Sequence, residues 1–90
     1  MLLVRAGEEK NFEKDFSIAS SSIRVIKGYR RHNLHRCLEQ PGKYLLLVEW
    51  DQLEDHTVGF RQSPHYQDWK KLLHHYYDPF PVVEHYERVL

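Results

Sequence analysis

The sequence predicts one small α+β domain in which helices pack on one face of an antiparallel sheet. Ninety residues make a single domain, residues 1–90, since domains usually contain about 50–200 residues. Apolar residues recur at helical spacing in residues 8–27 and again in residues 63–78. Between these segments, residues 29–39 and 44–50 have the composition of two strands, and the turn that joins them predicts antiparallel pairing.

The first elements are a short strand and a long amphipathic helix. Met1 to Arg5 is expected to be a strand, which Gly7 interrupts. From Glu8 onward the spacing of apolar residues becomes helical, and Gly28 ends the helix. One stripe of this helix, with residues three or four apart, holds Phe12, Phe16, Ala19, Ile23 and Ile26.

Residues 29–39 alternate in character, which predicts a strand with Tyr29, Arg31 and His35 on one face and Leu34 on the other. This strand is polar for its length, as an edge or half-exposed strand is expected to be.

The tetrapeptide 40–43 predicts a β-turn. Pro41 suits the second turn position, and Gly42 supplies the positive φ that the third position of a type II turn needs. The strand that follows, Tyr44 to Trp50, should therefore pair antiparallel with the preceding one.

Capping signals predict two further helices. Asp51 is expected to cap the first, with Glu54 three residues later as in a capping box. Ser63 is expected to be the N-cap of the second and Pro64 its first helical residue. Two prolines end that helix, and Val82–Val89 is expected to form the last strand.

The predicted order β-α-β-β-α-α-β, with right-handed crossovers, is the split βαβ or ferredoxin-like arrangement, which puts all helices on one face of the sheet. The central strand nevertheless carries Leu45 and Leu47 on the face opposite Tyr44 and Trp50. Because burying one Leu is worth about 1.5–3 kcal/mol, we expect a homodimer in which a second copy covers this face. The alternative is a partly exposed face, since single apolar residues are common on surfaces.

Composition narrows the classes of function. Lys plus Arg and Asp plus Glu are both 13, so the formal net charge is zero, and no nucleic acid partner is expected. The apolar run Met1–Val4 is too short for a signal peptide or a membrane span. A single cysteine, Cys37, is typical of a reducing compartment, so a cytoplasmic protein that does not enter the membrane is expected.

Motifs along nearly the whole chain carry a resemblance to a known family. The most specific is Tyr44–Trp50, an apolar strand ending in Glu-Trp, which a helix and then Ser63-Pro64 follow. The other motifs are Val4–Glu8, Phe12, Gly28–Arg30, His35–Glu39, Leu53–His56, Phe60–Gln62, Tyr66 and Val83–Tyr86. On these residues the chain resembles the antibiotic biosynthesis monooxygenase (ABM) family.

The resemblance implies a dimeric α+β barrel built from two ferredoxin-like sheets, with a ligand cleft between sheet and helices in each subunit. Some members oxygenate aromatic polyketides or quinols with molecular oxygen and use no metal or flavin, so no cofactor is implied. This chain has a shorter first strand than is usual in the family. Haem-degrading relatives use an Asn on the first strand and a Trp and a His on later helices. This first strand has no Asn. Gly59 or Phe60 stands nearest the position of that Trp, and Lys70 lies near the position of that His. The resemblance therefore disfavours haem degradation.

Seven histidines are the most unusual feature of the composition. His32 and His35 are three apart on a strand and point to opposite faces. His74 and His75 are adjacent on a helix, about 100° apart around its axis. Because metal ligands must converge, no metal site is expected.

His35, His56 and His65 are the candidates for proton transfer, because histidine titrates near neutral pH. Our hypothesis is that one of them deprotonates a phenolic substrate, whose anion then reacts with oxygen. His65 follows Ser63 at a helix N-terminus, which disfavours its protonated form. The alternative for each is a surface or structural histidine. The side chains expected to line a cleft for a small, flat aromatic ligand are Trp50, Phe60, Tyr66, Trp69, Leu73 and Tyr76.

Two functions of different classes follow. The first is a cofactor-independent monooxygenase that oxidises a small aromatic phenol or quinol with molecular oxygen. The second is a non-catalytic homodimer that binds a small ligand or another protein. An open cavity with an inward-pointing His or Tyr favours the enzyme, whereas a cleft filled by Phe60, Tyr66 and Trp69 favours the binding protein.

Overall fold

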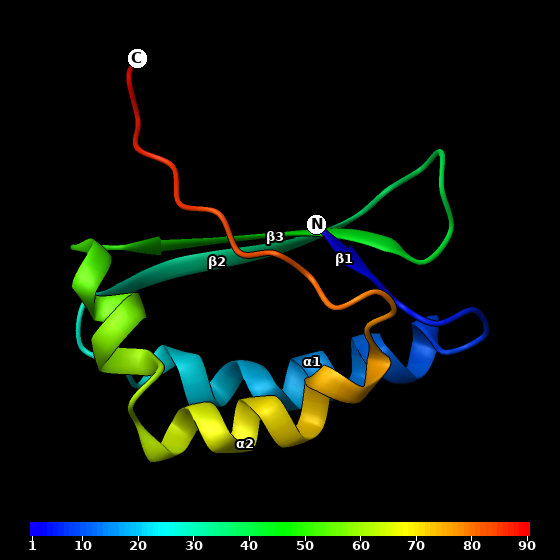
Figure 1. Cartoon of the computed structure of the whole chain (residues 1–90), viewed down its shortest axis with the longest axis horizontal. Coiled ribbons are helices and arrows are strands. Elements are labelled where there is room, and N and C mark those ends of the chain that lie inside the picture. Colours follow the sequence, from blue (N-terminus) through cyan, green and yellow to red (C-terminus); the bar gives the residue numbers. More distant parts are fainter.

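The computed structural model describes all 90 residues and shows a three-stranded antiparallel sheet with two helices on one of its faces (Figure 1). The elements in chain order are β1 (Leu2–Leu3), α1 (Glu9–Arg24), β2 (Tyr29–Arg36), β3 (Lys43–Trp50), the π-helical segment η1 (Asp55–Phe60), α2 (Pro64–Leu73) and the 3-10 helix η2 (His74–Tyr76). The α+β, ferredoxin-like fold that the sequence predicts is confirmed, with one strand fewer than expected.

Helix α1 packs the predicted apolar stripe against the sheet and against α2. Phe12, Phe16, Ala19 and Ile23 are no more than 5% exposed, whereas Ile18 on the opposite face is 54% exposed. Burial of large apolar side chains is worth about 1.5–3 kcal/mol each. The stripe therefore supplies much of the energy that holds α1 beneath the sheet.

Strand β3 is central in the sheet order β1-β3-β2. Its pairing with β2 contains a β-bulge between Tyr29 and Arg31, where Tyr29 lies opposite Trp50 and Arg31 opposite Glu49. The bulge adds one residue to β2 and turns Tyr29 to the helix side, where it packs against the core. The prediction that Tyr29 shares a face with Arg31 and His35 is therefore wrong.

Local signals between the elements have mixed outcomes. Gly42 has a φ of 81°, as the predicted turn requires, and the side chain of Ser63 accepts a hydrogen bond from the backbone of Tyr66, as an N-cap should. The capping box of Asp51 and Glu54 is wrong. Asp51 instead pairs with Arg30, and the carboxylate of Asp55 accepts the hydrogen bond from the Gln52 backbone.

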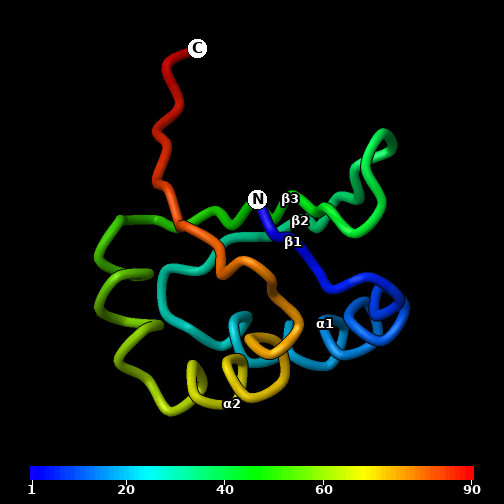
Figure 2. The backbone as a smooth tube through the Cα atoms, turned by 45° about the vertical axis from the view of Figure 1, so that its right-hand side comes forward, coloured from blue at the N-terminus to red at the C-terminus, as the bar shows by residue number.

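The last predicted strand, Val82–Val89, is wrong. The backbone of Val4 bridges to Tyr77, and the N–H of Asp78 donates to the carbonyl of Leu3 over 2.9 Å. No backbone hydrogen bond extends this pairing into residues 79–90, which pass beside the sheet and then leave it toward the C-terminus (Figure 2). Proline lacks the N–H that a ladder needs, and Pro79 and Pro81 stand where the pairing stops.

The core lies between the sheet and the helices and consists of 12 buried apolar side chains. On the inner face of β3, Tyr44 is 1% exposed, whereas Leu47 on the outer face is 47% exposed. One face of the sheet therefore retains apolar surface, as the sequence predicts. None of the helices has the length and apolar content that crossing a membrane would need.

Candidate active site

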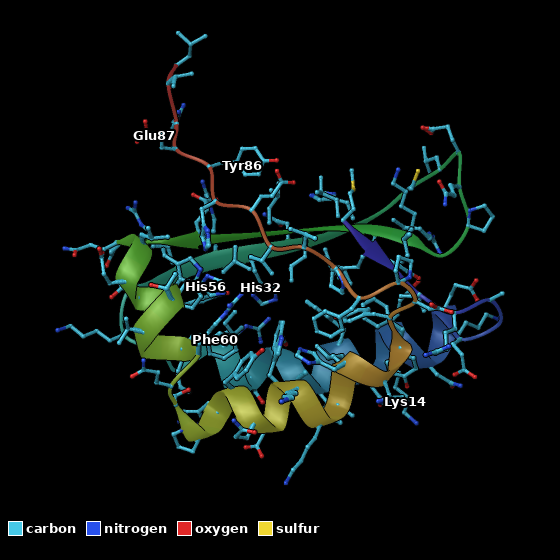
Figure 3. All side chains as sticks on the ribbon, in the orientation of Figure 1. Lys14, His32, His56, Phe60, Tyr86 and Glu87 are labelled. Carbon is cyan, nitrogen blue, oxygen red and sulfur yellow. The ribbon has the colours of Figure 1, made fainter.

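Three aromatic rings gather near the end of β3, and η1 contributes two of them. Trp50 is the last residue of β3, and the ring of His56 stacks on it with centroids 5.6 Å apart and an interplanar angle of 25°. Phe60, the last residue of η1, lies 6.0 Å from Trp50 at 34°. We call Trp50, His56 and Phe60 the aromatic shelf. Figure 3 shows His56 and Phe60 on the helix side of the sheet.

The electrostatic surroundings of His56 keep its ring neutral at physiological pH. Burial, followed by the nearby charges of Arg61 and His85, lowers the pKa of His56 to about 4. Its Nδ1 lies 2.9 Å from Nε2 of His85, and its Nε2 has no hydrogen-bond partner in the protein. A half-buried neutral imidazole with one nitrogen that has no protein partner offers a lone pair to a bound molecule.

A second titratable pair lies on the inner face of β2. The hydroxyl of Tyr29 is 2.6 Å from Nδ1 of His32, and the His32 ring contacts Phe16 edge-on with centroids 5.8 Å apart. Burial, followed by the charge of Arg24, lowers the pKa of His32. The sequence interpretation did not name His32 as a candidate, because the bulge that brings Tyr29 beside it has no visible sequence signal.

The three histidines predicted for proton transfer are not brought together. His35 lies opposite Leu45 on the outer face of the sheet and is exposed. His65 is exposed in the first turn of α2. No hydrogen bond or ring contact joins either of them to His56, so His56 is the one of the three that lies within the aromatic shelf.

Most of the residues expected to line a cleft belong to the core. Phe60, Trp69, Leu73 and Tyr76 are no more than 7% exposed, whereas Trp50 and Tyr66 are partly buried. Phe60 contacts Trp69 and Tyr66 edge-on, with centroids 5.6 Å and 5.3 Å apart. These rings fill much of the space behind the shelf with one another.

The hydroxyl of Tyr76 points out of the core toward α1. It donates a hydrogen bond of 2.5 Å to the carboxylate of Asp15, and this bond raises the pKa of Tyr76 to about 12. Tyr76 therefore remains protonated and anchors η2 to α1, a structural role rather than that of a base.

Two of the open hollows on the surface lie away from the shelf. One, of about 350 Å³, lies between Leu3 and the residues Phe80 to Val82. The other, of about 450 Å³, lies beside Leu34 and Tyr44. No three His, Cys, Asp or Glu side chains converge in the way that a metal site requires.

Comparisons with known proteins agree with this fold. The chain matches the antibiotic biosynthesis monooxygenase family over residues 1–72. It is 54% identical to the uncharacterised protein YczJ of Bacillus subtilis strain 168 over 89 residues, which are 99% of this chain and 94% of YczJ. A crystal structure from Bordetella bronchiseptica, described as a candidate antibiotic biosynthesis monooxygenase, superimposes with a TM-score of 0.94 at 36% identity and covers 99% of this chain and 91% of its own. The chain therefore belongs to the antibiotic biosynthesis monooxygenase family.

Proposed function

We propose that this protein is a cofactor-independent monooxygenase that oxidises a small aromatic phenol or quinol with molecular oxygen. The observation that carries the proposal is His56, a neutral and half-buried imidazole whose ring stacks on Trp50 and Phe60 and whose Nε2 has no hydrogen-bond partner in the protein. Membership of the family and the likeness to the Bordetella protein support the class of reaction.

In the proposed reaction, Nε2 of His56 takes the hydroxyl proton of the substrate and leaves a phenolate against the shelf. The phenolate gives one electron to oxygen, and the resulting radical and superoxide combine to form a carbon–oxygen bond. The proton on His56 then passes to the peroxide. Loss of water then breaks the O–O bond of that peroxide and the C–H bond of the same carbon, which becomes a quinone carbonyl. One oxygen atom of O₂ thus enters the product and the other leaves as water.

We propose that the working unit is a homodimer in the cytoplasm. The outer face of the sheet supports the dimer, because the large apolar side chain of Leu47 there is 47% exposed. The single Cys37, which has no disulfide partner within the chain, supports a reducing compartment.

Oxygen uptake with a panel of hydroquinones and anthrone-like phenols tests the reaction. We expect uptake of one O₂ per quinone formed, and labelled oxygen should appear in the product in equal amounts with labelled water. Release of hydrogen peroxide without label in the product would show an oxidase instead. Absence of uptake above buffer with every substrate would refute the enzyme.

Variants of the three histidines test the assignment of the base. His56→Ala should lower kcat by roughly 10²–10⁴-fold, which is the usual contribution of a general base. His35→Ala and His65→Ala serve as matched controls, since both side chains are exposed and lie on other elements. Equal activity in all three variants would refute a histidine base, and a loss confined to either control would show that the base is misassigned.

One observation favours the second candidate function, a non-catalytic homodimer that binds a small ligand or a protein. Phe60 is 2% exposed and Trp69 is 7% exposed, and they pack on each other where an enzyme of this kind needs room for substrate. A protein that binds members of the same panel, as measured by quenching of tryptophan fluorescence, but consumes no oxygen would be this binding protein.

A further inference from the structure

The C-terminal segment, residues 81–90, is joined to the rest of the chain by one hydrogen bond. Nε2 of His85 lies 2.9 Å from Nδ1 of His56, and the two ring centroids are 5.1 Å apart. The neighbouring side chains of the segment point into solvent, with Tyr86 82% exposed and Val89 84% exposed. Figure 3 shows Tyr86 and Glu87 on the far side of the sheet from His56. The segment therefore leaves the His56 side of the sheet directly after His85.

We infer that His85 is a positioning residue for His56, holding the proton of the His56 ring on Nδ1 so that Nε2 remains free to act as the base. This inference rests on the proposed function, in which His56 accepts the substrate proton. The inference gives the C-terminal segment a role at the site, because His85, 29 residues after His56 in sequence, sets the position of the proton on the His56 ring.

The argument rests on the two ways in which a pair of neutral imidazoles can share one hydrogen bond. Either His56 donates from Nδ1 to His85, or His85 donates from Nε2 to His56. In the second arrangement the proton of His56 sits on Nε2, the nitrogen without a protein partner, and no lone pair is left for a substrate. Only the first arrangement leaves Nε2 as an acceptor, and it requires a partner that accepts at Nδ1.

The same contact matters after the proton has moved. When Nε2 has taken the substrate proton, the His56 ring is a cation whose Nδ1–H points at His85. A hydrogen bond from a charged donor is stronger than one between neutral groups. His85 therefore stabilises the charge that develops on His56, and it also holds the ring in its stack on Trp50. Arg61 opposes that charge, and so does His85 when it carries a proton on both nitrogens, so the positioning role requires a neutral His85.

Nitrogen NMR of the histidine side chains tests the pair without depending on activity. We expect His56 to carry its proton on Nδ1 in the unaltered protein and to become a mixture of both tautomers in His85→Ala. His85→Gln should restore the Nδ1 form, because the amide oxygen of Gln also accepts a hydrogen bond. Val89→Ala, in the same segment and 84% exposed, is the matched control and should leave the spectrum unchanged.

A His56 protonated on Nε2 in the unaltered protein, or a tautomer that does not respond to His85→Ala, would overturn the inference. If the proposed oxygenation occurs, His85→Ala should lower kcat by about 10- to 100-fold and leave KM unchanged. This loss is smaller than that expected for removal of the base itself. His85→Gln should recover most of the lost kcat. An equal loss in Val89→Ala would show that the segment acts only as structure. Absence of oxygenation in the unaltered protein would refute the proposed function, while the NMR result would still decide the pair.

Discussion

The dependence of stability on pH offers the sharpest check on the environment of His56. The folded protein holds the pKa of His56 at about 4, against 6.5 for the free side chain. The unfolded chain therefore takes up a proton as the pH falls below 6.5, while the folded chain does not. The contribution of His56 to the free energy of unfolding is fully present above pH 6.5 and is lost as the pH falls toward 4.

The size of this loss follows from the change in pKa. A fall of about 2.5 in pKa corresponds to about 3.4 kcal/mol, at about 1.36 kcal/mol for each pH unit. His56 is only half-buried, so solvent screens part of the effect, and we expect a loss of about 1–2 kcal/mol between pH 7 and pH 4. His32 and His74, whose pKa values burial also lowers, change stability in the same direction.

The measurement is urea unfolding at pH 7, 6, 5 and 4, for the unaltered protein and for His56→Gln, at one fixed protein concentration. The difference in free energy between the two should shrink by about 1–2 kcal/mol over this range, because His32 and His74 act equally in both. His65→Gln is the control, since His65 is exposed. A difference for His56→Gln that stays constant with pH would refute the buried, neutral imidazole on which the site is built.

Three further substitutions test how the fold is held. Phe12→Ala should lower the free energy of unfolding by about 3–5 kcal/mol, because Phe12 is 0% exposed and its ring contacts four others. Ile18→Ala, at 54% exposed on the same helix, should lower it by less than about 0.5 kcal/mol. Similar midpoints of thermal unfolding for the two variants would contradict this. Gly28→Ala should lower the free energy of unfolding by about 2 kcal/mol, since φ is +87° and a Cβ would come within 1.9 Å of the Asp55 carboxylate. An unchanged midpoint of urea unfolding would show that position 28 is not strained. Ser63→Ala should lower the free energy of unfolding by about 1 kcal/mol through loss of the α2 cap. Ser63→Asn should retain most of the stability, because its side chain can also cap the helix. Equal losses in the two variants would show that the hydroxyl does not cap.

Helices and turns were predictable because their determinants lie close together in the chain. The stripe of α1, the positive φ of Gly42 and the cap of Ser63 each depend on residues within a few positions of one another. The two faces of β3 were predictable for the same reason, since alternation along a strand is a local property. The capping box at Asp51 failed, because the N–H of Asp51 that Glu54 would accept donates to the carbonyl of Gly28, and the carboxylate of Asp51 pairs with Arg30. Both contacts depend on the fold.

The candidate site was predictable in composition but not in geometry. Sequence named Trp50 and Phe60 among the side chains expected to line a cleft and His56 among the possible bases, but only the structure brings the three rings together. It did not separate His56 from His35 and His65, because exposure depends on how the elements pack.

By itself, the sequence determined the fold class, the family and the amphipathic faces of the helices and of β3, because these follow from short-range periodicity and from motifs. Tertiary structure alone decided the side of the sheet to which Tyr29 points, the meeting of His56 with His85, and the separation of residues 82–89 from the sheet. Each of these depends on register or on a neighbouring edge contributed by residues far away in the chain. A bulge shifts every later side chain by one position, and an extended segment becomes a strand only where another backbone offers it hydrogen bonds.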